Sequence, residues 1–119
     1  MTHLLRQHSA TLYTLSKCPP GTRKKILKAA PNGLIKVISQ CAKNTIKGNI
    51  PLTRVHISKL KPHRLILRKL ANKSLSLKKK RALLVQRGAG FLPFLLGPIL
   101  TGLAKPLLSG LANTFFPQN

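Results

Sequence analysis

Apolar side chains recur every three or four positions along most of the first ninety residues, which is the spacing of amphipathic helices. The first apolar stripe runs from Leu4 to Leu15 and predicts one helix that ends before Pro19. No part of this region alternates apolar and polar residues for long enough to predict a strand. The pattern therefore predicts an all-α protein built from short, basic, amphipathic helices.

Cap residues divide the next part of the chain into two further helices. Thr22 is expected to cap a short basic helix over residues 23–30, which stops at a proline. Asn32 is expected to cap a second helix, with apolar residues on one face. Gly48-Asn49 should end that helix, because glycine tolerates the left-handed conformation of a C-terminal cap.

Three more signals follow before the charged region ends. Thr53 is expected to start a helix that kinks or restarts at Pro62 and continues over residues 63–71. Ser76 is expected to cap a last basic helix over residues 77–87. The sequence also leaves open that these helices become ordered only when a partner is bound.

The hydropathy pattern changes at Gly88-Ala89-Gly90, after which the chain is almost uncharged. The uninterrupted apolar run after this junction has 14 residues and contains two prolines, whereas a spanning helix needs about 18 or more. We expect residues 1–87 to form a basic nucleic-acid-binding module, residues 88–90 a hinge, and residues 91–119 an apolar tail for assembly or membrane contact. The tail residues expected to make that contact are Phe91, Leu92, Phe94, Leu95, Leu96, Ile99 and Leu100.

The charge of the chain excludes several classes of function. The 119 residues include 22 Lys and Arg but no Asp or Glu, so the formal net charge is +22. Without carboxylates the chain has no Asp or Glu to act as a general acid or base, and no oxygen cage for Mg²⁺ or Ca²⁺. The two cysteines and four histidines show no metal-binding spacing. We therefore expect a binder of polyanions that is not an enzyme and needs no cofactor.

Duplex DNA is the polyanion that this composition favours. Aromatic residues make up only 4% of the chain, which argues against a protein that stacks unpaired bases. Because duplex DNA carries one charge per ~1.7 Å, 22 cations would neutralise about 37 Å of it. The residues expected to contact phosphates are Arg23, Lys24, Lys25, Lys28, Lys59, Lys61, Arg64, Arg68, Lys69, Lys73, Lys78, Lys79, Lys80, Arg81 and Arg87.

Three segments of the chain resemble the small basic proteins of Polinton (Maverick) elements and adintoviruses, which are similar to the adenoviral X, or mu, core peptide. They are Cys41-x-x-Asn44-x-x-Lys47-Gly48-Asn49-Ile50-x-Leu52, Lys61-x-His63-x-x-x-Leu67-Arg68-x-Leu70-Ala71, and Lys78-Lys79-Lys80-Arg81-x-Leu83-Leu84-Val85-Gln86-Arg87-Gly88-x-Gly90-Phe91-Leu92. The resemblance covers roughly Ala30 to Leu108. It implies a virion core protein that condenses double-stranded DNA inside a capsid, with capsid proteins as further partners.

The resemblance also implies processing by a viral cysteine protease. Gln86-Arg87-Gly88-Ala89-Gly90 is similar to the cleavage pattern of adenovirus-like systems, with the cut expected between Ala89 and Gly90. Gln86 stands where that pattern usually has Met, Ile or Leu. A plain flexible hinge is the alternative interpretation of the same glycines.

Several alternatives remain open at this point. The apolar tail also fits a membrane-active or capsid-anchoring protein whose basic half binds anionic lipid. Basic helices also occur in ribosomal and organellar RNA-binding proteins, and the acid-free N-terminus resembles a weak mitochondrial presequence. Residues 44–70 are a weak mimic of a helix-turn-helix. The expected location is the virion and the host nucleus, with Lys78 to Arg81 as a nuclear localisation signal.

Overall fold

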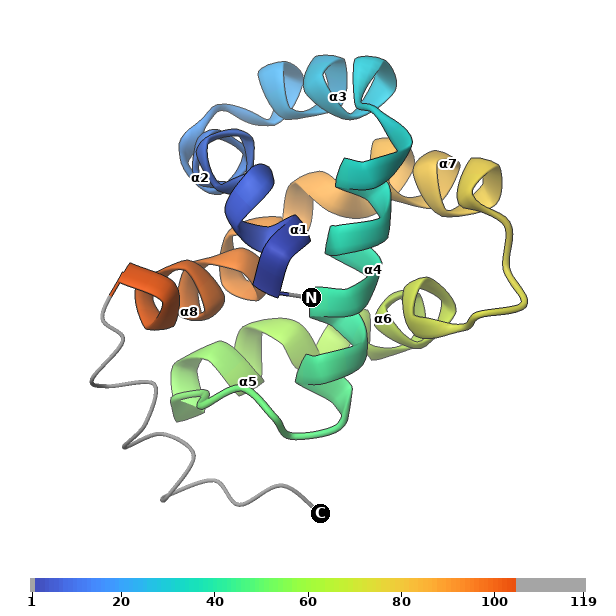
Figure 1. Cartoon of the computed structure of the whole chain (residues 1–119). Helices are drawn as coiled ribbons and strands as arrows, with labels where there is room; N and C mark the ends of the chain where they lie inside the picture. The colour runs from blue at the N-terminus through green and yellow to red at the C-terminus, as the bar shows by residue number, and fades with distance from the viewer. Residues whose placement is uncertain (1, 105–119) are drawn as a thin grey trace.

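A computed structural model describes residues 2–104 of the chain, and every regular element among them is a helix. Helix α4 (Asn32–Ile46) crosses the middle of the molecule, and the other helices surround it (Figure 1). The prediction of an all-α protein is confirmed. The surrounding α-helices and 3-10 helices (η) are α1 (Thr2–Gln7), α2 (Ser9–Lys17), α3 (Pro20–Ala29), α5 (Arg54–Leu60), η1 (Lys61–His63), α6 (Arg64–Ala71), α7 (Leu77–Arg87), η2 (Gly88–Gly90) and α8 (Leu92–Ala104).

The single helix predicted near the N-terminus is wrong, because His8 divides it into α1 and α2. His8 has non-helical backbone angles, φ −107° and ψ 12°. A Cβ built at Gly33 would lie 2.9 Å from His8 Nε2, so the imidazole occupies the space that this glycine leaves. On the two sides of this break, α1 contacts α4 and α2 packs against α8.

Two of the predicted N-terminal caps are confirmed. The hydroxyl of Thr53 accepts a hydrogen bond from the backbone N–H of His56 at 3.2 Å, and the two residues form a reciprocal capping box. The hydroxyl of Ser76 accepts from the backbone N–H of Lys79 at 3.2 Å. The predicted break at Pro62 is also present, as η1 between α5 and α6.

The caps predicted at Thr22 and Asn32 are wrong. Helix α3 begins earlier, at Pro20, whose fixed φ suits a first helical position that needs no N–H donor. Asn32 is the first residue of α4, and Pro31 precedes it as the cap. The side chain of Asn32 instead accepts a hydrogen bond from Arg81, a contact between distant parts of the chain.

Gly48 ends α4 as predicted. Its φ is +77°, in the region that glycine adopts without steric cost. The N–H of Asn49 donates to the carbonyl of Asn44 at 2.9 Å, and the N–H of Gly48 donates to the carbonyl of Thr45 at 3.2 Å. These two bonds form a Schellman motif, which satisfies carbonyls that the helix end leaves free.

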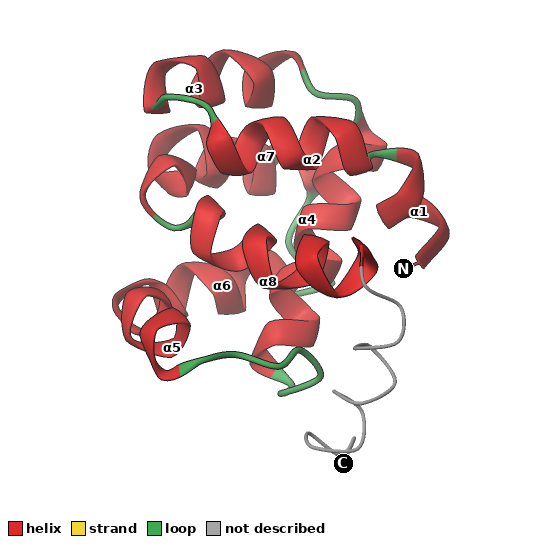
Figure 2. Cartoon of the chain, turned by 90° about the vertical axis from the view of Figure 1, so that its left-hand side faces the viewer, coloured by secondary structure: helices red, strands yellow, loops and turns green. Residues whose placement is uncertain are grey.

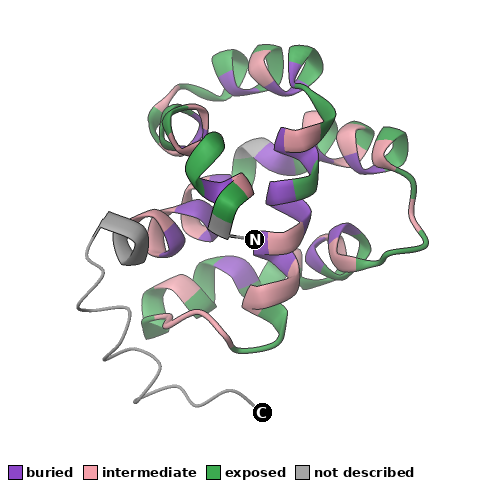
Figure 3. Ribbon diagram, viewed as in Figure 1, coloured by how far each residue is buried: buried purple, intermediate pink, exposed green. Residues whose placement is uncertain are grey.

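One hydrophobic core joins the helices, and it continues from the N-terminal region into α8. The buried apolar residues form a single cluster that lines the inner faces of the helices (Figure 3). Figure 2 shows α8 running beneath α2, with which it packs. The radius of gyration is 13.4 Å, close to the ~13 Å expected of a compact chain of this size. The cluster contains Leu5, Leu12, Leu15, Leu27, Ala30, Leu34, Ile35, Val37, Ile38, Cys41, Ala42, Leu60, Leu67, Leu70, Leu84, Phe91, Leu92, Leu95, Leu96 and Ile99.

Within residues 2–104, no single helix is both long enough and apolar enough to cross a membrane. Among the residues that the structure describes, one bent pair meets the length and composition requirements together, Leu77–Arg87 with Leu92–Leu100, and the chain bends by 108° between these two helices.

Candidate nucleic-acid interface

The structure exposes all but three of the cations predicted to contact phosphates. They are distributed over several helices and the loop that joins α6 to α7. The exposed residues are Lys24, Lys25, Lys28, Lys59, Lys61, Arg64, Arg68, Lys69, Lys73, Lys78, Lys79 and Arg87. Arg81 is half-buried, and Arg23 and Lys80 are buried.

Three of the helices that carry these cations lie next to one another. Helix α7 packs against both α3 and α6, so helices that carry exposed cations from distant parts of the sequence are neighbours in the fold (Figure 1). We call the exposed lysines and arginines of α3, α6 and α7 the cationic surface. It comprises Lys24, Lys25, Lys28, Arg64, Arg68, Lys69, Lys78, Lys79 and Arg87.

Arg23 is held inside the fold. The residue is only 5% exposed. Its Nε donates to the carbonyl of Leu15 at 2.7 Å and its Nη2 to the carbonyl of Cys18 at 2.6 Å, both at the end of α2. Helix C-termini carry partial negative charge and free carbonyls, so a buried guanidinium finds a partner there in a chain without carboxylates.

Arg81 makes the same kind of contact at the end of α3. Its Nη1 donates to the carbonyls of Leu27 and Ala30 at 3.0 and 2.5 Å, and its Nη2 to the Oδ1 of Asn32 at 3.1 Å. The planar guanidinium can hold three acceptors at once, which an ammonium on a flexible stem cannot match. The two arginines therefore occupy the negative ends of two helices, where other proteins use glycine caps or water.

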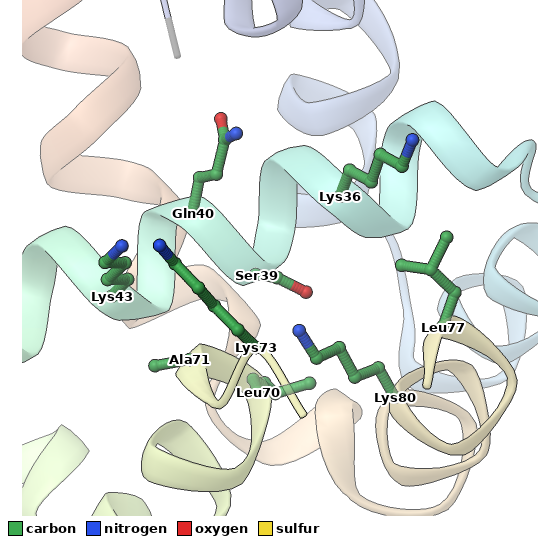
Figure 4. A pocket seen from close by; sticks show the side chains of 9 residues that line it. All are labelled: Lys36, Ser39, Gln40, Lys43, Leu70, Ala71, Lys73, Leu77 and Lys80. Carbon is green, nitrogen blue, oxygen red and sulfur yellow. The ribbon is translucent and has the colours of Figure 1, made fainter. Parts of the chain in front are cut away.

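A pocket of about 270 Å³ lies beside the cationic surface, where α4 faces α7 and the loop after α6 (Figure 4). Four lysines line it. Lys36 and Lys43 come from α4, Lys73 from the loop, and Lys80 from the first turns of α7. The remaining lining residues are Ser39, Gln40, Leu70, Ala71 and Leu77.

The lysines of this pocket are not equivalent electrostatically. The positive charges of Lys47 and Lys73 lower the pKa of Lys43, with a smaller contribution from partial burial. Burial lowers the pKa of Lys80. The ammonium of Lys80 points toward the hydroxyl of Ser39, and the ammonium groups of Lys43 and Lys73 lie near each other (Figure 4). Each lowered pKa shows that the folded protein disfavours the charged form, as expected of cations without a counter-charge.

Lys36 and Lys43 line the pocket but were not among the residues predicted to contact phosphates. They stand seven positions apart, which is two turns of a helix, and so lie on the same side of α4. This seven-residue spacing is the signal in the sequence that could have identified them. Their proximity to Lys73 and Lys80 depends on the packing of α4 against α6 and α7.

The residues predicted for membrane or assembly contact lie in the core or against it. Phe91, Leu92, Leu95 and Leu96 are fully buried and Ile99 is 5% exposed, while Phe94 and Leu100 pack against the cluster. To reach a membrane through these side chains, α8 would have to leave the core. Residues 105–119, the rest of the predicted tail, lie outside the described residues.

The predicted cleavage site lies at the join between α7 and α8. Gly88 to Gly90 form the 3-10 helix η2, and Gly90 is exposed while the next residue, Phe91, is buried. A protease that binds its substrate as an extended strand would have to unwind this turn. Cleavage between Ala89 and Gly90 stays a prediction.

In comparisons with known proteins, no family model, no curated protein and no solved structure matches this chain.

Proposed function

We propose that this protein binds and condenses double-stranded DNA without sequence preference, as a component of a virion core. The observation that carries the proposal is the combination of a net charge of +22, without any Asp or Glu, and a helical fold that exposes most of the cations among its described residues. A surface whose cations have no internal counter-charge favours a partner that supplies negative charge at high density.

The dimensions of the molecule agree with such a role. Its longest extent is 37 Å. A duplex of that length carries about 22 phosphate charges, which is close to the charge of one protein molecule. One molecule for each 37 Å of duplex would therefore supply about the charge that neutralises it, although Arg23 and Arg81 direct their guanidinium groups into the fold.

A salt titration of duplex binding tests the proposal. The logarithm of the binding constant should fall linearly with the logarithm of salt concentration, by about 0.9 for each engaged cation, and equally for duplexes of different sequence. The double variant Lys78→Gln/Lys79→Gln should reduce this slope by about 2, because both lysines would lose phosphate contacts. A matched control, Gln86→Ala on the same helix, should leave the slope unchanged.

Two results would contradict the proposal: a slope near zero, or a strong preference for one duplex sequence. Competition with duplex RNA and with ribosomes separates DNA condensation from the RNA-binding alternative. The capsid partners, the protease and the nuclear and virion locations that the resemblance implies stay predictions. The intact mass of particle-derived protein tests the cleavage, which a full-length mass alone would contradict.

A further inference from the structure

The pocket between α4, α7 and the loop after α6 is lined by four lysines. Its four lysines come from three separate segments of the chain, so they meet only in the folded protein. Lys80 is 7% exposed, and the sequence contains no Asp or Glu that could pair with it. A buried or crowded ammonium is normally paired, because transfer of an isolated charge out of water is unfavourable.

We propose that this pocket binds a phosphate group. The phosphate belongs either to the backbone of a bound nucleic acid or to a free polyphosphate. The first of these two sources rests on the proposed function, which this inference deepens. A phosphate has several charged oxygens that can accept hydrogen bonds from ammonium groups on different sides. The first turn of α7 contributes its positive dipole end at the edge of the pocket.

The volume of the pocket is sufficient for this ligand. With about 270 Å³ available, and about 30 Å³ for each water in the liquid, the pocket has room for a phosphate and bridging waters. The hydroxyl of Ser39 donates to the carbonyl of Ile35 at 2.9 Å, and the ammonium of Lys80 points toward this hydroxyl at the pocket wall (Figure 4). An anion there would connect α4 to α7 and to the preceding loop, so its binding would also stabilise the fold.

Binding of tripolyphosphate to the full-length chain tests this proposal. Two double variants with the same net charge are compared with the parent protein: Lys43→Gln/Lys73→Gln in the pocket, and Lys24→Gln/Lys28→Gln on the exposed face of α3. Calorimetry at low salt should show tripolyphosphate binding weakened about tenfold or more by the pocket variant and by less than about threefold by the α3 variant. Equal weakening would overturn the proposal, because it would mean that only net charge matters.

Thermal unfolding gives a second measurement on the same samples. Tripolyphosphate at about a hundred times its Kd should raise the Tm of the parent protein by about 10 °C, and that of the pocket variant by much less. Nuclear magnetic resonance of the lysine side chains should show the pKa of Lys43 rising when tripolyphosphate is added, and an unchanged pKa would count against the pocket. If the double variant loses its helical signal, the single loop variant Lys73→Gln gives the same comparison.

The DNA and tripolyphosphate affinities of the two variants distinguish the two sources of phosphate. They also distinguish failure of the pocket proposal from failure of the proposed function. If the pocket holds a DNA phosphate, tripolyphosphate competes with duplex DNA and the pocket variant loses more DNA affinity than the α3 variant. If it holds a free polyphosphate, DNA affinity falls equally in both variants while tripolyphosphate affinity falls only in the pocket variant. A flat salt slope for DNA together with intact tripolyphosphate binding would overturn the proposed function and leave the pocket. A steep salt slope for DNA, with tripolyphosphate binding weakened equally in both variants, would overturn the phosphate pocket and leave the proposed function.

Discussion

The guanidinium of Arg81 donates a hydrogen bond to the carbonyl of Ala30 at 2.5 Å, across 51 positions of sequence. The same side chain also reaches Leu27 and Asn32, so it fastens α7 to the end of α3 and the start of α4. A residue from the densest run of charge in the chain therefore stabilises the fold, and two of its neighbours in that run, Lys78 and Lys79, remain exposed.

Arg81→Lys should lower the free energy of unfolding by about 2 kcal/mol, because the ammonium cannot satisfy the same three acceptors. Chemical denaturation measures this change. Arg87→Lys is the matched control on the same helix, since Arg87 is exposed, and it should change the free energy of unfolding by less than about 0.5 kcal/mol. Equal effects of the two substitutions would show that the contact of Arg81 contributes nothing specific.

Leu95→Ala should lower the free energy of unfolding by about 2–5 kcal/mol, because it leaves a cavity in the core where α8 packs. Leu65→Ala removes the same atoms from a side chain that is 65% exposed and should have little effect. Urea denaturation of both variants makes the comparison. An unchanged stability of Leu95→Ala would mean that α8 does not belong to the core in solution.

Cys41 makes the fold sensitive to alkaline conditions. Burial raises the pKa of its thiol to about 12, from an ordinary value of 9.0. Between these values the unfolded chain loses the thiol proton while the folded chain retains it, so stability falls as pH rises, by up to about 1.4 kcal/mol per pH unit. Cys41→Ala should be less stable at neutral pH because of the smaller side chain, and its stability should decline less steeply between pH 9 and 12. Denaturation at a series of pH values would contradict this if both proteins gave parallel curves.

Lys80→Met should raise the free energy of unfolding by about 1 kcal/mol when no phosphate is present, because methionine fills similar space without a desolvated charge. The pKa of Lys80 lies below its ordinary value of 10.5 in the folded state, so the unfolded chain binds the proton more tightly. The parent protein therefore gains stability as pH rises toward 10.5, and the advantage of the variant should shrink over that range. Denaturation at neutral and alkaline pH in a phosphate-free buffer measures both effects, and a destabilised variant at neutral pH would contradict the prediction.

Local signals in the sequence located most helix boundaries, and the exceptions have a physical reason. Thr53, Ser76 and Gly48 act where they were predicted, because each satisfies backbone groups within its own turn. The caps predicted at Thr22 and Asn32 were wrong because a preceding proline, with its fixed φ, lies at the start of each helix. No local signal marked the break at His8, whose imidazole lies against Gly33 of another helix.

The sequence by itself determined the all-α class and the charge of +22, because helix periodicity and the ionisation of Lys and Arg need no knowledge of distant contacts. Only the tertiary structure decided which cations remain available to a partner. Arg23 and Arg81 turn inward to helix carbonyls, and Lys36 and Lys43 meet Lys73 and Lys80 in a pocket. It also placed Phe91 to Leu100 in or against the core. Burial depends on which helices meet, and residues as far apart as 30 and 81 make those contacts, so no window of sequence contains them.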